Sequence, residues 1–182
     1  TSKKEQIKMA RIKLHDKYFI TSITNDEIEK AIQVVAEQVS EYYKGKERPI
    51  ILSVLNGSFM FTASLMQKID TLVELSFIKL SSYCGTESTG EVKQVLGLNK
   101  DITGRNVLIV EDIVDTGRTL KDIYKILKGR NPLSLKVVTL LDKPSRRLVD
   151  FKADMSLFTI PDYFVIGYGL DCGEYYRNLP YI

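Results

Sequence analysis

The sequence has little of the residue types on which several classes of protein depend. Two cysteines, Cys84 and Cys172, and one histidine, His15, occur among 182 residues. Two distant cysteines do not make a disulfide scaffold, and with a single histidine they do not match a standard zinc site. A reducing, cytoplasmic compartment is expected for such a chain.

Long apolar runs and a strong charge excess are missing as well. No stretch approaches the roughly 20 apolar residues that a membrane span needs, and residues 1–11 lack the apolar segment of a secretory signal. Lysine and arginine exceed aspartate and glutamate by only 26 to 23, a net charge of +3. General nucleic-acid binders usually show a stronger basic excess, so neither a membrane nor a nucleic acid is expected as a partner.

The apolar content, 44% of the residues, is enough for one domain with a sizeable core. Thr24 and Glu27 form a capping box before an apolar stripe, which predicts an amphipathic helix to about Tyr43. Further helices are expected at 59–69 (apolar almost all round) and 118–128, and strands at 50–55, 72–80, 107–110, 135–141 and 164–166. Continuous apolar strands that alternate with helices predict an α/β fold with a mostly parallel sheet.

The segment 107–119 carries the strongest chemical signal. Four aliphatic residues predict a buried strand that ends in the acidic pair Glu111 and Asp112, and a third carboxylate follows at Asp115. The stretch 116–119 then opens a helix whose free N–H groups and dipole suit a phosphate. Acids beside a phosphate site are consistent with a ligand that also presents ribose hydroxyls or Mg²⁺. An acidic turn before a capped helix would explain two such residues, but not the whole arrangement.

This arrangement resembles the phosphoribosyl-pyrophosphate motif of the type I phosphoribosyltransferases: four aliphatic residues, two acids and Asp-Thr-Gly-x-Thr. From about Leu52 to Pro180 the chain is similar to one branch, the hypoxanthine-guanine phosphoribosyltransferases. The resemblance implies one phosphoribosyltransferase domain over 1–182, with a core at 24–160, a hood from 1–23 and 161–182, and a mobile loop at 81–103. The residues alone also allow a hairpin at 81–103.

The function that the resemblance implies is purine salvage. A Mg²⁺-dependent enzyme would transfer the phosphoribosyl group from phosphoribosyl pyrophosphate to hypoxanthine or guanine, giving IMP or GMP and pyrophosphate. A cytoplasmic homodimer or homotetramer is implied. A xanthine-preferring enzyme, and a regulator that binds nucleic acid in response to phosphoribosyl pyrophosphate, remain as alternatives.

The resemblance assigns the motif residues to the sugar phosphate and its metal. Glu111 and Asp112 would bind the ribose hydroxyls with Mg²⁺ nearby, and Asp115 would act as general acid or base at the purine N7. The 5′-phosphate would be held by the loop residues Thr116, Gly117, Arg118 and Thr119.

Residues outside the motif complete the implied site. Pyrophosphate would be bound by Leu55, Asn56 and Gly57 (often through a non-proline cis peptide), by Ser82 and Tyr83 of the mobile loop, and by Arg177. The purine side would consist of Lys143 at the 6-oxo group, Phe164 stacked on the ring, Val165 at the 2-position, and Asp171, which would bind a second Mg²⁺ through water.

Several of these residues carry no signal of their own. Taken alone, Lys143 would be a solvated turn residue, Phe164 a core residue, and Asp171 and Arg177 ordinary turn charges. Asn56 departs from the pattern, because many relatives carry lysine or arginine there. Pyrophosphate affinity is the property that this departure would affect.

Overall fold

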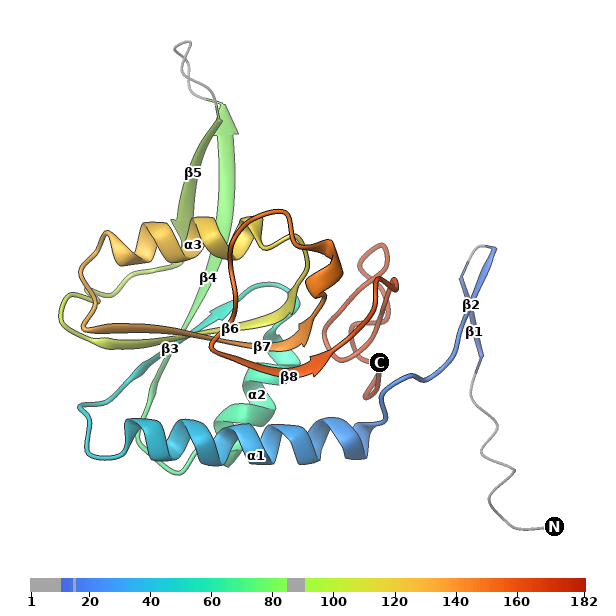
Figure 1. The fold of residues 1–182 in the computed structure, drawn as a ribbon, viewed down its shortest axis with the longest axis horizontal. Helices are drawn as coiled ribbons and strands as arrows, with labels where there is room; N and C mark the ends of the chain where they lie inside the picture. Colours follow the sequence, from blue (N-terminus) through green and yellow to red (C-terminus); the bar gives the residue numbers. More distant parts are fainter. Residues whose placement is uncertain (1–10, 15, 85–90) are drawn as a thin grey trace.

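The computed structural model describes residues 11–14, 16–84 and 91–182 of the chain. In chain order its elements are β1 (Ile12–Leu14), β2 (Lys17–Phe19), α1 (Asn25–Tyr43), β3 (Ile50–Val54), α2 (Phe59–Lys68), β4 (Glu74–Cys84), β5 (Glu91–Leu96), β6 (Asn106–Val114), α3 (Arg118–Lys128), β7 (Ser134–Asp142), the 3₁₀ turn η1 (Pro144–Arg146) and β8 (Met155–Thr159). One sheet runs in the order β5-β4-β3-β6-β7-β8, with β5 antiparallel to β4 and the other pairs parallel. Figure 1 shows α3 on one face of this sheet and α1 with α2 on the other. The predicted α/β fold is confirmed.

Helix α1 begins where the capping box predicts. The Thr24 hydroxyl accepts a hydrogen bond from the Glu27 N–H at 3.2 Å, and the Glu27 carboxylate accepts one from the Thr24 N–H at 2.8 Å. Its apolar stripe, which includes Ile28 and Ile32, is buried against the sheet. Helix α3 likewise spans the predicted residues. Among the described residues, no helix combines the length and apolar character that crossing a membrane requires.

The parallel strands separate two apolar layers. Ile51 of β3 and Leu108 of β6 pack with α1 and α2, whereas Ile50 of β3 and Ile109 of β6 pack on the α3 side. Each central strand is therefore buried on both faces, which is why the sequence shows continuous apolar runs there instead of alternation.

Two predictions about apolar segments are wrong. No strand forms at 164–166, and Phe164 is 58% exposed; the sheet ends instead with β8, which pairs with β7. As an edge strand with an exposed Ser156, β8 lacks the continuous apolar run of the inner strands. Helix α2 is not buried all round, since Phe59 is 41% exposed while Phe61 and Leu65 are buried.

The segment 81–103 contains a β-hairpin. Strand β4 continues to Cys84 and pairs with β5, so that Ser82 lies opposite Lys93. Lys93 also forms an ion pair with Asp122 of α3 at 2.6 Å, and the hairpin extends beyond α3 in Figure 1. The predicted hairpin is thus present in the described residues, the mobility of 81–103 stays a prediction, and residues 85–90 lie outside the described ranges.

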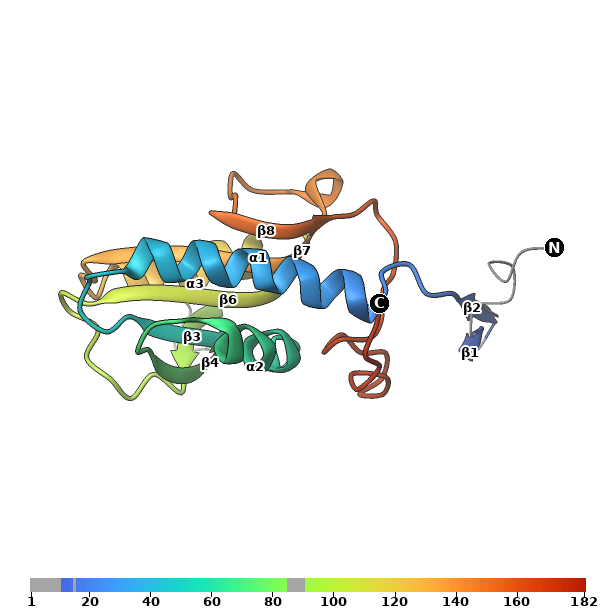
Figure 2. The same ribbon diagram turned by 90° about the horizontal axis from the view of Figure 1, so that it is seen from below.

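The C-terminal residue lies against the segment that leads into α1. The N–H groups of Ser22 and Ile23 donate to the Ile182 carbonyl at 2.7 and 2.9 Å, and the Ile182 N–H donates to the Ile23 carbonyl at 3.0 Å. Figure 2 shows the C-terminal coil beside the start of α1. These bonds tie the C-terminal coil to the residues that immediately precede α1.

A single carboxylate joins α1, α2 and the C-terminal coil. Glu29 accepts hydrogen bonds from the Tyr168 hydroxyl at 2.6 Å, the Lys68 ammonium at 2.7 Å and the Ser64 hydroxyl at 2.8 Å. Burial raises the pKa of Glu29, but the bonds from Lys68, Tyr168 and Ser64 outweigh it and hold this pKa below its ordinary 4.5.

Replacing Glu29 by alanine should therefore destabilise the fold. The substitution leaves the hydroxyl of the buried Tyr168 without its acceptor, which lowers the free energy of unfolding by about 1–3 kcal/mol. Urea unfolding measures this. Because the pKa of Glu29 is lower in the folded state, its contribution is present above the unfolded-state pKa and is lost as pH falls through the folded-state pKa.

The matched control is Glu41→Ala on the same helix. Glu41 forms only an exposed ion pair with Lys44 at 3.7 Å, so its removal should change the free energy of unfolding by less than about 1 kcal/mol. Equal effects of the two substitutions would contradict the role of Glu29.

Candidate active site

A cavity of about 300 Å³ lies at the carboxyl ends of β3 and β6. This is the edge at which ligands of parallel α/β sheets bind. Nine of the predicted site residues line it, together with four neighbours, Val54, Ile113, Val114 and Leu120. Those nine are Leu55, Asn56, Gly57, Glu111, Asp112, Asp115, Thr116, Gly117 and Thr119. The structure therefore brings the acidic motif and the loop after β3 into one site.

The acidic pair lies within β6, not after it. The strand continues to Val114 because β7 provides ladder partners as far as Asp142. The Asp112 N–H donates to the Glu111 carboxylate at 2.9 Å, and the Ile113 N–H donates to the Asp112 carboxylate at 2.7 Å. Glu111 is 6% exposed. Burial and then the neighbouring charge of Asp112 raise the pKa of the Glu111 carboxyl well above its usual range.

The loop after β3 approaches this pair closely. The peptide bond between Leu55 and Asn56 is cis, as the resemblance suggested. A β-carbon on Gly57 would overlap the Asp112 carboxylate, so any larger residue there would force that carboxylate to move. Buried hydroxyls hold the loop: Ser58 donates to the Val54 carbonyl at 2.6 Å and pairs with the Ser53 hydroxyl at 2.7 Å.

The loop between β6 and α3 presents backbone groups to the cavity. Gly117 has a φ of 84°, a left-handed conformation that favours glycine, and no side chain caps α3. The Arg118 N–H donates to the Thr116 hydroxyl at a long 3.4 Å, and the next first-turn N–H groups, of Thr119 and Leu120, are available to an anion. Thr119 lines the cavity, whereas Arg118 is exposed and does not.

The C-terminal coil reaches the loop after β3. Arg177 donates to the Gly169 carbonyl at 2.8 Å and forms an ion pair with Asp171 at 3.3 Å. A β-carbon on Gly169 would in turn overlap the Gly57 carbonyl. Arg177 and Asp171 are thus tied to the edge of the cavity through Gly169, without lining it.

Lys143 connects to the cavity through a chain of charges. It is 6% exposed, and its ammonium lies 3.9 Å from one oxygen of Asp162. The other oxygen of Asp162 lies 3.7 Å from Arg146, whose Nε donates to Asp115 at 3.1 Å. Neither Arg146 nor Asp162 is among the site residues predicted from the sequence. The surface turn that holds Asp162 gave no local signal.

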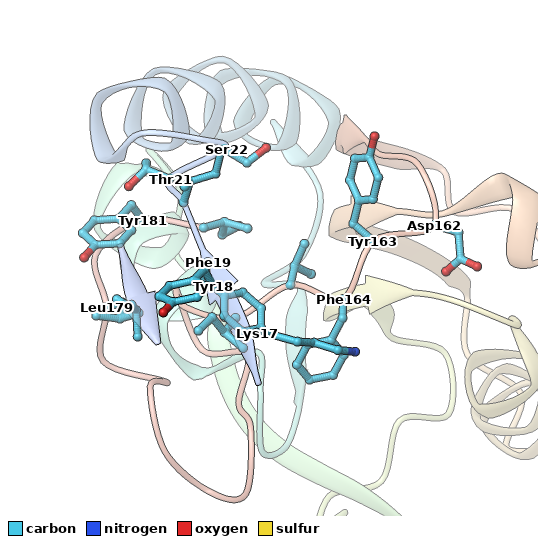
Figure 3. Close-up of a pocket in the computed structure, with 15 residues that line it drawn as sticks. Lys17, Tyr18, Phe19, Thr21, Ser22, Asp162, Tyr163, Phe164, Leu179 and Tyr181 are labelled. Carbon is cyan, nitrogen blue, oxygen red and sulfur yellow. The ribbon is translucent and has the colours of Figure 1, made fainter. Parts of the chain in front are cut away.

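Phe164 and Val165 lie apart from the other residues, in a second cavity of about 710 Å³. This cavity lies between residues 12–22 and the C-terminal segment, and Figure 3 shows Phe19 and Phe164 among its side chains. The rings of Phe19 and Phe164 meet edge to face at 6.1 Å. Ser82 and Tyr83 lie in β4; Ser82 lines neither cavity, and the Tyr83 side chain lies outside the described part.

The residues at the first cavity fit a magnesium ion. Within the described ranges, no group of three or more His, Cys, Asp or Glu side chains is arranged to hold a metal. Magnesium, however, usually binds through one or two carboxylates, with water and substrate phosphates completing its shell. The adjacent Glu111 and Asp112 carboxylates form such a partial donor set.

Comparison with known proteins points to one family. The family model for the phosphoribosyl transferase domain matches residues 20–172. The hypoxanthine-guanine phosphoribosyltransferase of Streptococcus pneumoniae is 48% identical over 88% of this chain and 89% of its own length. The enzyme of that name from Bacillus subtilis is 45% identical over the same shares. A crystal structure of a hypoxanthine phosphoribosyltransferase from Staphylococcus aureus matches with a TM-score of 0.81, at 44% identity and 88% coverage of both chains.

The close approach of Gly57 to Asp112 gives a testable prediction. Gly57→Ala should lower the free energy of unfolding by about 1–3 kcal/mol, because the added methyl group overpacks the site. In an Asp112→Ala background the same change should cost less, since the overlapping carboxylate is gone. Urea unfolding of the four proteins measures both effects.

Gly129→Ala serves as the matched control. A β-carbon on Gly129 meets its nearest neighbour at an ordinary 3.4 Å, so this substitution should be close to neutral. An equal cost of Gly57→Ala with and without Asp112 would show that the overlap is not its cause.

Proposed function

This chain belongs to the phosphoribosyltransferase family, and we propose that it is a hypoxanthine-guanine phosphoribosyltransferase of purine salvage. It transfers the phosphoribosyl group from phosphoribosyl pyrophosphate to hypoxanthine or guanine, giving IMP or GMP and pyrophosphate. The observation that carries the proposal is the single cavity that combines three carboxylates, Glu111, Asp112 and Asp115, with the open N-terminus of α3. Relatives of that name at 45–48% identity support the choice of substrate.

The sugar phosphate binds in the first cavity. The backbone N–H groups at the start of α3, with Thr116 and Thr119, bind the 5′-phosphate, while Glu111 and Asp112 accept hydrogen bonds from the ribose hydroxyls. Loss of pyrophosphate creates positive charge on the sugar, which preorganised carboxylates stabilise. When bound, Mg²⁺ would be held by Glu111 and Asp112, and by Asp171 through water, and would neutralise charge on the pyrophosphate.

The leaving group and the purine occupy the two sides of the sugar. The 55–57 loop and Arg177 bind pyrophosphate, with Asn56 providing no positive charge, and Ser82 and Tyr83 close over the reaction centre. Asp115 accepts the N7 proton of the purine. Phe164 stacks on the ring, and Val165 meets its 2-position. Lys143 donates to the 6-oxo group; the amino group of adenine cannot accept this bond.

The assembly and location are further parts of the proposal. The family resemblance supports a homodimer or homotetramer with small-molecule substrates, in the cytoplasm. Size-exclusion chromatography with light scattering tests the assembly directly.

The first experiment measures nucleotide formation from phosphoribosyl pyrophosphate and each of hypoxanthine, guanine, xanthine and adenine, by ultraviolet absorbance with and without Mg²⁺. We expect Mg²⁺-dependent turnover of hypoxanthine and guanine and none of adenine, because a site that hydrogen-bonds an oxo group rejects an analogue without it. Faster turnover of xanthine would favour the xanthine-preferring alternative. Binding of the sugar phosphate without turnover of any purine would instead favour the regulator.

The role of Asp115 is tested by Asp115→Asn, which keeps the size of the side chain but removes its charge. Losing a general acid–base group should lower kcat by roughly 10²–10⁴. The KM for phosphoribosyl pyrophosphate should change little, since the phosphate-binding N–H groups are untouched. Unchanged kcat would exclude Asp115 as the acid–base group.

A further inference from the structure

Asp115 and Lys143, the two groups assigned to the edge of the purine, are linked through two residues that the proposed mechanism does not use. The order is Asp115, Arg146, Asp162, Lys143, with N–O distances of 3.1, 3.7 and 3.9 Å between successive members. Negative and positive charges alternate along this chain. Each member therefore neutralises its neighbours.

The backbone fixes the geometry of this charge chain. The Lys143 N–H donates to the Val114 carbonyl at 2.9 Å, and the Leu148 N–H donates to the Thr116 carbonyl at 3.0 Å. Arg147 adds a bond from its guanidinium to the Asp115 carbonyl at 3.0 Å. The turn that carries Arg146 is thus bonded to both sides of Asp115, so the Arg146 side chain extends from a fixed base.

The surroundings of Lys143 and Asp115 explain why Arg146 and Asp162 are needed between them. Lys143 has a nearly buried side chain (8% exposed), and Asp162 is the carboxylate with which it forms an ion pair among the described residues. A buried ammonium without such a partner is costly. Asp115 has a side chain that is 42% exposed and would sample several rotamers in water without a donor. Arg146 gives it one, in the directional Nε–H geometry that suits a carboxylate.

From this arrangement we infer that Arg146 is a positioning residue for the reaction, resting on the proposed function of Asp115 and Lys143. Its guanidinium holds the Asp115 carboxylate toward the purine N7. Through Asp162 it also keeps the Lys143 ammonium toward the 6-oxo group. N7 and the 6-oxo group lie on the same edge of a purine, so one fixed pair of protein charges recognises both atoms.

The experiment compares steady-state kinetics of the full chain with those of Arg146→Gln and Arg146→Lys. Arg146→Gln should reduce kcat/KM for hypoxanthine about tenfold or more, the effect of losing roughly 1.4 kcal/mol of positioning. Its KM for phosphoribosyl pyrophosphate should stay within about twofold. Arg146→Lys keeps the positive charge but lacks the planar guanidinium, and it should recover part of the lost kcat/KM. Arg130→Gln is the matched control, because Arg130 is an exposed arginine beyond the end of α3.

A double-mutant cycle with Asp162→Asn tests the connection between Arg146 and Asp162. Arg146→Gln should cost less in the Asp162→Asn background than in the parent, because the two residues act through one connection.

Three results would overturn the inference. One is an active parent with Arg146→Gln kinetics equal to those of Arg130→Gln. Another is evidence that Arg146 has only a structural role. Such evidence would be an equal rise of the KM values for hypoxanthine and phosphoribosyl pyrophosphate in both Arg146→Gln and Arg146→Lys, or a lowered unfolding midpoint that accounts for the loss of kcat/KM. The third is a parent that turns over no purine, which would remove the proposed function and this role with it.

Discussion

The site depends on how two adjacent carboxylates are accommodated near the end of a buried strand. Glu111 and Asp112 follow one another in β6, and Glu111 is almost completely covered by protein. Like charges at this spacing repel strongly where the effective dielectric constant is low. Among the described residues, no lysine or arginine forms an ion pair with either of them. Burial and the charge of Asp112 raise the pKa of Glu111, so ionisation of both acids is costly without a partner; ribose hydroxyls, a divalent cation or a developing sugar cation would each stabilise the ionised pair.

The packing around this centre follows from the same constraint. The loop after β3 approaches Asp112 through Gly57, which has no β-carbon to collide with the carboxylate. Gly169 then packs on the Gly57 carbonyl, which ties the C-terminal coil to the loop. The buried hydroxyls of Ser53, Ser58 and Thr62 bond to one another and to a backbone carbonyl, so none of these three hydroxyls is unpaired.

Much of the fold could be predicted because the signals are local. Each of these signals lies within one segment of the sequence. They are the capping box of α1, the apolar stripe of α3 and the continuous apolar run of β3. The acidic motif was equally visible, since its residues are consecutive. What failed depended on neighbours distant in sequence. Strand β6 is longer than its apolar run because β7 pairs with it beyond the run.

The missed residues of the site have the same explanation. Arg146 lies 31 residues from Asp115 in sequence, and Asp162 meets Lys143 across a separate turn. Neither residue belongs to a periodic pattern or a helix cap that would indicate its partner in the sequence. The same holds for the approach of Gly57 to Asp112, which arises only when β3 and β6 pair in parallel.

The two ends of the proposed site differ in how their charges are balanced, and this difference suits the two reactants. On the sugar side, no lysine or arginine of the described residues forms an ion pair with the acid pair, which in the proposed mechanism stabilises the positive charge that develops there. On the purine side, Asp115, Arg146, Asp162 and Lys143 neutralise one another. A neutral purine would then bind to one hydrogen-bond acceptor, Asp115, and one donor, Lys143, in a region without net charge. If Arg146 were absent, Asp115 would add its charge to the acid pair, and the purine edge would no longer be distinct from the sugar side. In the proposed mechanism, the alternation of charge thus separates recognition of the base from stabilisation of the sugar cation.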